Sequence, residues 1–235
     1  MVRFEKIKFE VKTLNTTVGN FPSSMAAIPY IARTVQKEEK MTDEEAEKLK
    51  KKMEEELVET MEAMEEEEME VEEEDEDKLN VFLRDKTGIY IEERHVKGWL
   101  KEHFRILKMR GYREAINHGV YVFPYGDSFV GNEKFKIYLT RDGKVIREPD
   151  GILKRPIQVM TPKGGRSSYK LLEYLEPPVE FSFVIEVVDS VSRKLFTKEI
   201  LKTMGYIMGN IGFLGDRSLG MGKCEVKVEK IGGGE

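Results

Sequence analysis

Apolar residues alternate with polar ones in several short stretches of the chain, with a period of two residues. The first stretch covers residues 2–14. The strongest covers 179–188, where Phe, Ile or Val occupies every second position from Phe181 to Val187. This periodicity predicts half-buried β-strands. Shorter strand-like runs lie at 88–91, 120–123, 135–139, 144–147, 157–160 and 223–231. An Asp-Gly pair between two of these runs predicts a hairpin turn.

Two stretches follow the period of an α-helix instead. The first spans residues 92–108, and its apolar residues share one helical face. These residues are Val96, Leu100, Phe104 and Leu107. The second helix begins after Thr197, a favourable N-cap, and Gly209 or Gly212 ends it. We expect Trp99, in the first helix, to belong to the core.

The order of these elements, apart from two insertions, is strand, helix, strand, strand, helix, strand. That order predicts an α+β fold with a ferredoxin-like (RRM-like) βαββαβ core formed by residues 1–36 and 79–235. The first insertion, residues 37–78, is acidic and partly helical, because a Thr-x-x-Glu capping box precedes an apolar stripe. The second insertion is a basic hairpin. Residues 15–31, which are rich in Gly, Ser and Pro, predict a long loop.

Charge is distributed unevenly along the chain. Residues 54–77 contain sixteen Asp and Glu residues and no Lys or Arg, although the formal net charge of the whole chain is only −5. The remaining residues therefore carry a net charge of +11. A basic body of this kind favours a polyanionic partner such as RNA. The acidic stretch is either a solvated insertion or an element that mimics nucleic acid or docks on a neighbouring protein.

The composition excludes several kinds of site. No run of 18 or more apolar residues occurs, so we expect no membrane span. Cys224 is the only cysteine. It excludes an internal disulfide, fits the reducing cytoplasm and is expected to be a small packed residue. No Cys and His residues lie at zinc-binding spacings, and we expect neither a metal nor another cofactor.

The segment from Gly212 to Gly222 contains four glycines and one arginine, Arg217. Such a density of glycine predicts sharp turns or a close approach to a ligand. Exposed backbone amides beside an arginine suit a polyanion. A second candidate region combines cations with one aromatic residue that can stack on a base. Its RNA-binding candidates are Lys154, Arg155, Lys163, Arg166 and Tyr169. The alternative for this region is an ordinary charged hairpin.

Two motifs together resemble a known family. The first is the glycine-rich segment, which has the form Gly-x-x-Gly-x-x-x-x-Gly-x-Gly and precedes the last strand. The second is residues 91–101, Ile-Glu-Glu-Arg-His-Val-Lys-Gly-Trp-Leu-Lys, at the start of the first helix. In this order and in these elements they resemble the CRISPR-associated RAMP superfamily. The helix segment is similar to the one that often ends Leu-Lys-Gly-x-Leu-Arg in its backbone subunits.

The resemblance implies binding of single-stranded RNA through its backbone. It also implies self-association or assembly with other RAMP-like subunits in a ribonucleoprotein. In that superfamily the glycine-rich loop and the start of the first helix lie near the RNA. Carried over by motif, the RNA-binding positions are Lys97, Gly98, Lys101, Gly215, Arg217, Gly220 and Gly222. The chemistry agrees, because a helix N-terminus binds phosphate and an arginine makes forked contacts to it.

Two departures from the family bear on catalysis. RAMP backbone subunits that cut RNA carry an aspartate in the loop after the first strand, whereas residues 15–32 contain neither Asp nor Glu. We therefore expect a non-catalytic protein. RNA-processing members commonly use a histidine near the first helix, so a metal-independent endoribonuclease with His95 as general acid or base is one alternative. A protein-binding scaffold that docks through the acidic stretch is another.

Deletion of residues 40–78 tests the role of the acidic stretch. If the stretch mimics nucleic acid, its removal is expected to tighten non-specific RNA binding, because a competing polyanion is lost. The affinity for a labelled oligoribonucleotide, measured at several salt concentrations beside the intact chain, checks this. Unchanged affinity with unchanged salt dependence would rule out mimicry of nucleic acid.

Overall fold

Residues 3–22, 79–131, 133–161 and 164–233 are described by the computed structural model, and they form an α+β protein with helices and largely antiparallel sheets. The chain divides into two units. One comprises Met1–Gly19, Phe82–Gly151 and Tyr174–Glu235, and the other comprises Asn20–Val81 and Ile152–Glu173. The predicted acidic insertion, residues 37–78, lies outside the described residues.

The main sheet of the first unit has β1 (Phe4–Thr13) near its centre. This strand pairs antiparallel with β13 (Glu180–Val188) on one side and with β14 (Cys224–Gly233) on the other. Strand β7 (Val120–Pro124) pairs with the far side of β13. The spatial order is therefore β14, β1, β13, β7. The predicted strands over 2–14 and 179–188 are confirmed.

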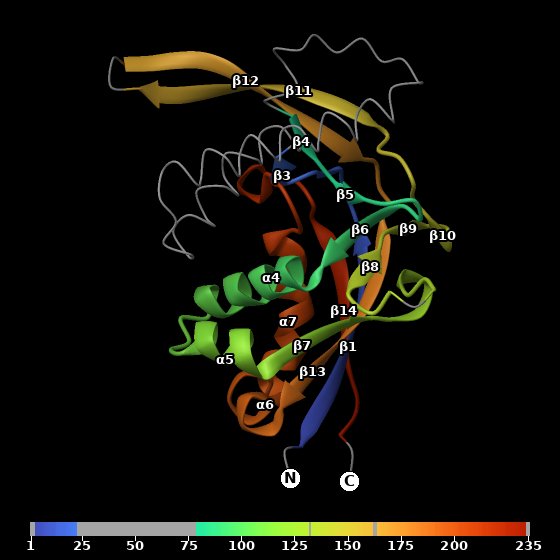
Figure 1. The fold of residues 1–235 in the computed structure, drawn as a ribbon. Coiled ribbons are helices and arrows are strands. Elements are labelled where there is room, and N and C mark those ends of the chain that lie inside the picture. The colour runs from blue at the N-terminus through green and yellow to red at the C-terminus, as the bar shows by residue number, and fades with distance from the viewer. Residues whose placement is uncertain (1–2, 23–78, 132, 162–163, 234–235) are drawn as a thin grey trace, which may run out of the picture. The chain divides into compact units, whose positions relative to one another are not determined.

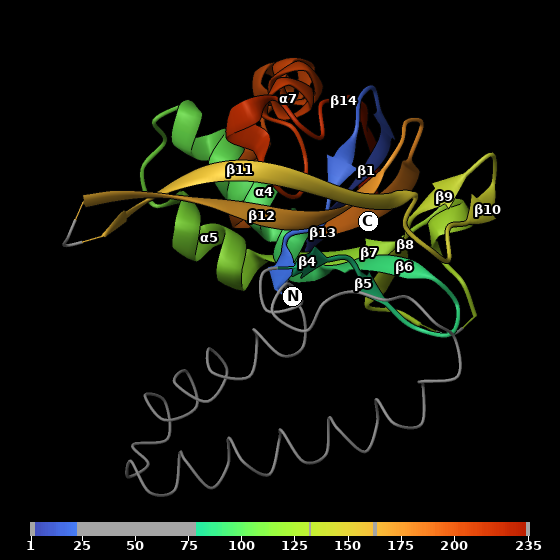
Figure 2. The same cartoon turned by 90° about the horizontal axis from the view of Figure 1, so that it is seen from above.

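Two helices cover one face of this sheet: α4 (Glu93–Ile106) and α7 (Lys198–Ile211) (Figure 1, Figure 2). The core lies between the helices and the sheet. At its centre the rings of Phe9 and Phe183 stack with centroids 4.8 Å apart. Trp99 is 1 % exposed, which confirms its predicted place in the core.

The ends of α7 follow the predicted chemistry. The side chain of Thr197 accepts a hydrogen bond from the backbone N–H of Ile200, and Gly212, with φ of 79°, ends the helix. Gly209 has a different role inside the helix. A Cβ on Gly209 would lie 2.2 Å from the carbonyl oxygen of Cys224, so only glycine lets α7 lie this close to β14.

Several short elements have no counterpart among the predicted ones. They include α5 (Tyr112–Gly119), α6 (Asp189–Leu195), η1 (Gly126–Ser128) and η2 (Arg217–Leu219). A small sheet joins β5 (Leu83–Arg84), β6 (Ile89–Glu92) and β8 (Lys136–Tyr138). The predicted Asp-Gly hairpin is confirmed between β9 (Thr140–Arg141) and β10 (Lys144–Val145). Asp142 and Gly143 both have positive φ there.

The second unit contains most of a long hairpin of two strands, β11 (Gly151–Thr161) and β12 (Gly164–Leu175) (Figure 1). Strand β12 also pairs with β4 (Leu79–Val81), which pairs with β3 (Phe21–Pro22). The prediction of a long loop over 15–31 was therefore wrong at β3, and residues 23–31 lie outside the described part of the chain. Besides β3, it overlooked β2 (Thr17–Val18), which pairs with the Tyr174–Leu175 end of β12. Strands of two residues are too short for any periodicity to show.

The side chain of His103 is fully buried on α4, and neither ring nitrogen has a hydrogen-bond partner among the described residues. Burial lowers its pKa from 6.5 to about 4. Below pH 6.5 the unfolded chain binds a proton that the folded protein excludes until about pH 4. The free energy of unfolding is therefore expected to fall as the pH falls through this window, by up to about 3 kcal/mol from His103.

Urea denaturation at a series of pH values measures this dependence. His103→Leu is expected to raise stability at low pH and to reduce the slope between pH 6.5 and 4, because it leaves no buried N–H without a partner. His118→Leu is the matched control, since His118 is exposed. An unchanged slope in His103→Leu would contradict the assignment.

Candidate nucleic-acid interface

The glycine-rich loop, residues 212–223, is held against the segment that follows β1. The backbone N–H of Gly215 donates to the carbonyl of Val18 at 3.2 Å, and that of Gly222 donates to Thr16 at 3.0 Å. The N–H of Leu14 donates to Lys223 at 2.7 Å. Segments about 200 residues apart in sequence are thus joined by backbone hydrogen bonds, which fixes the course of the loop.

Most glycines of this loop are explained by contacts within the protein. A Cβ on Gly215 would lie 2.8 Å from the carbonyl oxygen of Gly19, and one on Gly222 would lie 2.1 Å from that of Phe213. Gly220 differs, because its φ is 82° but an added Cβ would meet no atom closer than 3.9 Å. The high density of glycine is therefore explained mainly by close packing of the backbone. At Gly220 the loop instead forms a turn that faces outward.

That outward turn is η2, where the side chain of Arg217 is exposed. No hydrogen bond or ion pair joins its guanidinium to any residue in the described part of the chain. Its charge is felt by Glu102 on α4: Arg105 holds the pKa of Glu102 below its usual value, and Arg217 lowers it further. The loop and α4 also meet in the core, where the rings of Trp99 and Phe213 lie 4.8 Å apart.

The three positions predicted on α4 differ in their surroundings. The ammonium of Lys97 already has two partners within the protein. It lies 2.9 Å from a carboxylate oxygen of Glu93 and donates a hydrogen bond to the carbonyl of Asn117. Gly98 is exposed, and a Cβ there would meet nothing within 4 Å. Lys101 is half-exposed. The structure therefore favours Gly98 and Lys101 over Lys97 as positions that a ligand can reach.

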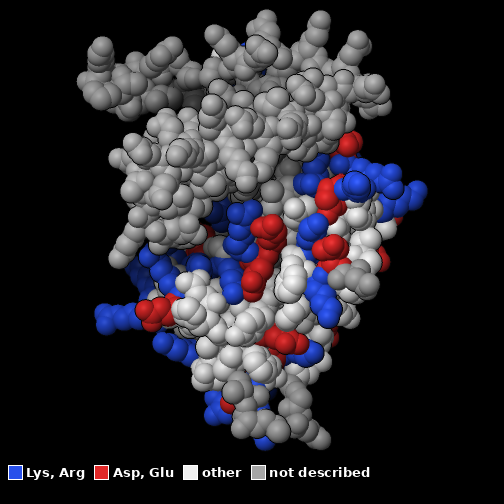
Figure 3. Space-filling model, viewed as in Figure 1, with Lys and Arg blue, Asp and Glu red and all other residues white. Residues whose placement is uncertain are grey.

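Lys and Arg side chains gather over α4 and α5 on the face seen in Figure 3. The side chains of Lys101, on α4, and Lys108, just after it, form no ion pair or hydrogen bond with any described residue. The predicted motifs at residues 91–101 and 212–222 thus meet where Phe213 packs on Trp99, and Arg217 acts on Glu102 of the same helix.

His95, the alternative catalytic residue, caps the start of α4. Its Nδ1 accepts a hydrogen bond from the backbone N–H of Glu92 at 3.1 Å, and the Glu92 side chain completes a capping box. Burial lowers the pKa of His95, which keeps the ring neutral at neutral pH. A neutral ring can accept this hydrogen bond, whereas a protonated one cannot. The structure therefore gives His95 a definite structural role.

The other predicted RNA-binding residues lie in the second unit. Lys154 on β11 places its ammonium 3.8 Å from the centroid of the Tyr169 ring on β12. Arg155 follows on β11 and is half-buried. Lys163 lies outside the described residues, and of Arg166 only the backbone, in β12, is described. The cation–π contact orients the predicted stacking residue Tyr169.

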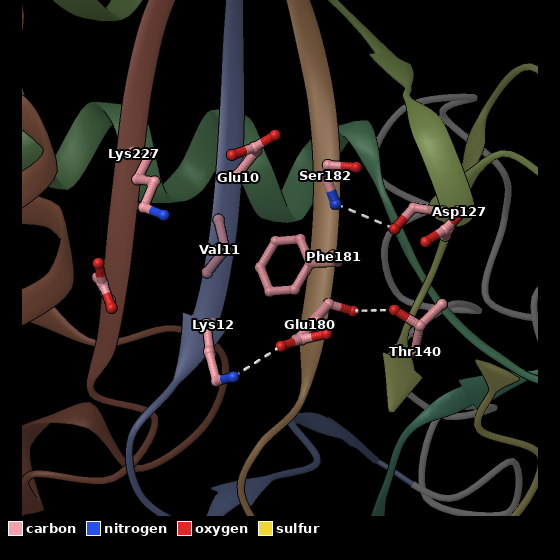
Figure 4. A pocket seen from close by; sticks show the side chains of 11 residues that line it. Glu10, Val11, Lys12, Asp127, Thr140, Glu180, Phe181, Ser182 and Lys227 are labelled. Atoms are coloured by element: carbon pink, nitrogen blue, oxygen red, sulfur yellow. Dashed lines mark hydrogen bonds and ion pairs between the residues drawn. The ribbon is translucent and has the colours of Figure 1, made fainter. Parts of the chain in front are cut away.

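The face of the main sheet away from the helices carries a pocket of about 350 Å³ (Figure 4). Its charged lining consists of Glu10, Lys12, Asp127, Glu180, Glu225 and Lys227. Lys12 is paired with Glu180 at 2.9 Å, and beside the pocket Lys8 is paired with Glu10 at 2.6 Å. Four carboxylates against two lysines repel a polyanion. This face is therefore a poor candidate for binding RNA.

The described residues contain no group of three or more His, Cys, Asp or Glu side chains placed to hold a metal ion. Cys224 is 5 % exposed, which confirms the predicted packed residue, and burial raises the pKa of its thiol to about 12. Among the helices of the described part, none has both the length and the apolar character that crossing a membrane requires.

No protein-family model matches the chain, and a search of curated proteins returns no significant match. The functional argument therefore depends on the chain's own residues and geometry.

One residue of this region escaped the sequence-based prediction. The side-chain amide of Asn15 donates to the carbonyl of Gly220 at 2.6 Å, and its oxygen accepts from the backbone N–H of Lys223 at 2.8 Å. Asn15 thus ties both ends of the turn that follows Arg217 to the end of β1. A lone asparagine in a Gly- and Ser-rich stretch gives no sequence signal for a partner about 205 residues away.

Asn15→Asp tests this tie. Aspartate keeps the acceptor for Lys223 but loses the donor, and it places a carboxylate against the carbonyl of Gly220. We expect a loss of about 1–3 kcal/mol in the free energy of unfolding and faster amide exchange in the glycine-rich loop. Asn210→Asp is the control, because the Asn210 side chain bonds only within its own helix, to Tyr206. Equal stability of the two variants would contradict the role of Asn15.

Proposed function

We propose that the protein binds single-stranded RNA through its backbone, as a non-catalytic protein similar to the backbone subunits of the RAMP superfamily. One observation carries the proposal. Phe213 of the glycine-rich loop packs on Trp99 of α4, and Arg217 in that loop is close enough to α4 to lower the pKa of Glu102. Arg217 has no ion-pair partner among the described residues, and Gly98 and Lys101 are accessible on the same helix. A ligand that contacts both elements meets an accessible helix surface and unpaired cations, which suits phosphate groups.

The proposed fold is the ferredoxin-like arrangement. In its support, α4 and α5 connect β1 to β7, and α6 and α7 connect β13 to β14. The two connections interleave, so that β1 and β13 are the inner strands in the order β14, β1, β13, β7. In this proposal the helix-covered side and its loop contact RNA. The open face of the sheet does not, because carboxylates outnumber lysines around its pocket.

Assembly belongs to the proposal as well. A protein that binds RNA without reading its sequence gains affinity when several copies lie along one strand. We therefore propose self-association or a place among RAMP-like subunits in a cytoplasmic ribonucleoprotein. RNA of a fixed length recovered with the protein from its own cells would support a set number of subunits.

The test is fluorescence anisotropy of a labelled oligouridylate titrated with the protein at several salt concentrations. The affinity is expected to fall steeply with salt, since phosphate contacts release counterions. Arg217→Ala and Lys101→Ala are expected to weaken binding about tenfold each. Lys227→Ala is the matched control, because Lys227 is an exposed lysine on the open face of the sheet. A flat salt response of the wild type would refute the proposal.

The same samples separate binding from cutting. Gel analysis of the RNA after incubation is expected to show full-length oligonucleotide with both the wild type and His95→Ala. Cleavage that disappears in His95→Ala would instead favour the metal-independent endoribonuclease, in which the ring leaves its capping position to act as a general acid or base.

A further inference from the structure

The exposed side of α4 carries a straight row of positions that the RAMP-like motif only partly includes. Arg94, Gly98, Lys101 and Arg105 are separated by four, three and four residues. At about 100° per residue they fall within about 60° of one another around the helix axis. The buried residues of α4, Val96, Trp99, Leu100, His103 and Phe104, lie on the opposite side. We name this row the α4 stripe.

The α4 stripe is a line of cations with a gap at Gly98. The side chains of Arg94 and Arg105 are 56 % and 60 % exposed. From Arg94 to Arg105 the stripe extends roughly 16 Å along the axis, at about 1.5 Å per residue. The loop that carries Arg217 meets α4 where Phe213 packs on Trp99, and the charge of Arg217 lowers the pKa of Glu102. The stripe and Arg217 together supply four positive charges on one side of the first unit.

Two cations of the stripe, Arg94 and Arg105, are paired with carboxylates of described residues. Nε of Arg94 lies 2.6 Å from a carboxylate oxygen of Glu92, and a terminal guanidinium nitrogen of Arg105 lies 2.6 Å from a carboxylate oxygen of Glu102. Exposed pairs of this kind stabilise a protein by about 0–1 kcal/mol, so a phosphate group can displace the carboxylate. The charge that remains is positive, in contrast to the open face of the sheet. Glu102, between Arg105 and Arg217, is the group that opposes a polyanion most directly.

Gly98 has no explanation in the packing of the described residues. A glycine inside a helix costs about 1 kcal/mol relative to alanine. At Gly209 a glycine is required despite this cost, because a Cβ would clash with the backbone of β14. At Gly98 a Cβ would meet only open space, so packing does not require glycine there. A bare helix backbone in the middle of the row lets a ligand approach more closely there than a side chain would allow.

We propose that the α4 stripe is a track for one strand of RNA, whose phosphates contact Arg94, Lys101, Arg105 and Arg217 and whose backbone passes over Gly98. The proposal rests on the proposed function and extends its site to Arg94 and Arg105. A single row of cations follows one line of phosphates, whereas a duplex presents phosphates of two strands across a groove. The track is therefore expected to bind single-stranded RNA in preference to a duplex. Because its contacts are to phosphates and not to bases, binding is expected to be independent of RNA sequence.

The experiment measures affinity for a labelled oligouridylate against salt concentration. Four phosphate contacts predict a slope of log affinity against log salt of about −2.8, and Arg94→Ala and Arg105→Ala are each expected to reduce its magnitude by about 0.7. Glu102→Gln is expected to raise the affinity, because a carboxylate beside the track is removed. Lys227→Ala, on the open face, is expected to leave the slope unchanged.

Gly98→Ala provides a second readout that separates structure from binding. The variant is expected to melt at a higher temperature than the wild type, because alanine favours the helix. It is nevertheless expected to lose affinity, because the methyl group lies under the strand. Gly98→Ala with raised stability and unchanged affinity would overturn the close approach.

The other outcomes are equally definite. If the wild type binds no RNA, the proposed function fails and the track with it. If Arg217→Ala weakens binding but Arg94→Ala and Arg105→Ala leave the slope unchanged, the proposed function stands and the track is refuted. Tighter binding of a duplex of the same length, or of an acidic peptide, would assign the stripe to a different ligand.

Discussion

Backbone-to-backbone contact between the segment after β1 and the glycine-rich loop is the constraint on which the proposed RNA-binding region depends. Gly215 and Gly222 have no room for a Cβ, because carbonyl groups of the neighbouring segment and of the loop itself occupy that space. Asn15 adds a side-chain bridge across the same contact. Strand β1 is an inner strand, paired on both sides. The backbone hydrogen bonds to the segment after it therefore anchor the loop that carries Arg217 to the centre of the sheet. An exposed arginine in a glycine-rich segment is thereby held in place.

The two faces of the first unit differ in their balance of positive and negative side chains. On the open face of the sheet, lysines and glutamates pair across strands, as Lys6 does with Glu186 and Lys12 with Glu180. On the helix side, the cations of α4 and of the glycine-rich loop exceed their carboxylate partners. The net charge of +11 outside the acidic stretch is therefore not spread evenly. The carboxylates around the pocket on the sheet disfavour a polyanion there, and the helix side is where the proposed RNA partner would bind.

The sequence was sufficient to predict the elements with a clear period, and it failed where partners are distant. Alternation located β1 and β13, and the apolar face of α4 followed from four residues. Strand β12 begins with glycines and serines, so its length of 12 residues was not recognised. The motif on α4 pointed to Lys97, but only the structure shows that Glu93 and Asn117 occupy its ammonium. The reason for Gly215 likewise depends on a carbonyl far away in the sequence, that of Gly19.

Trp99 has a consequence of its own, because it is the only tryptophan in the chain. Its indole N–H donates to the carbonyl of Met208 at 3.1 Å, and its ring contacts Phe213 at the base of the glycine-rich loop. The residue therefore sits where α4, α7 and the loop converge. Its fluorescence is a natural spectroscopic reporter of that junction, free of background from other indoles. Any event that loosens the loop from the helix changes the surroundings of one identified chromophore.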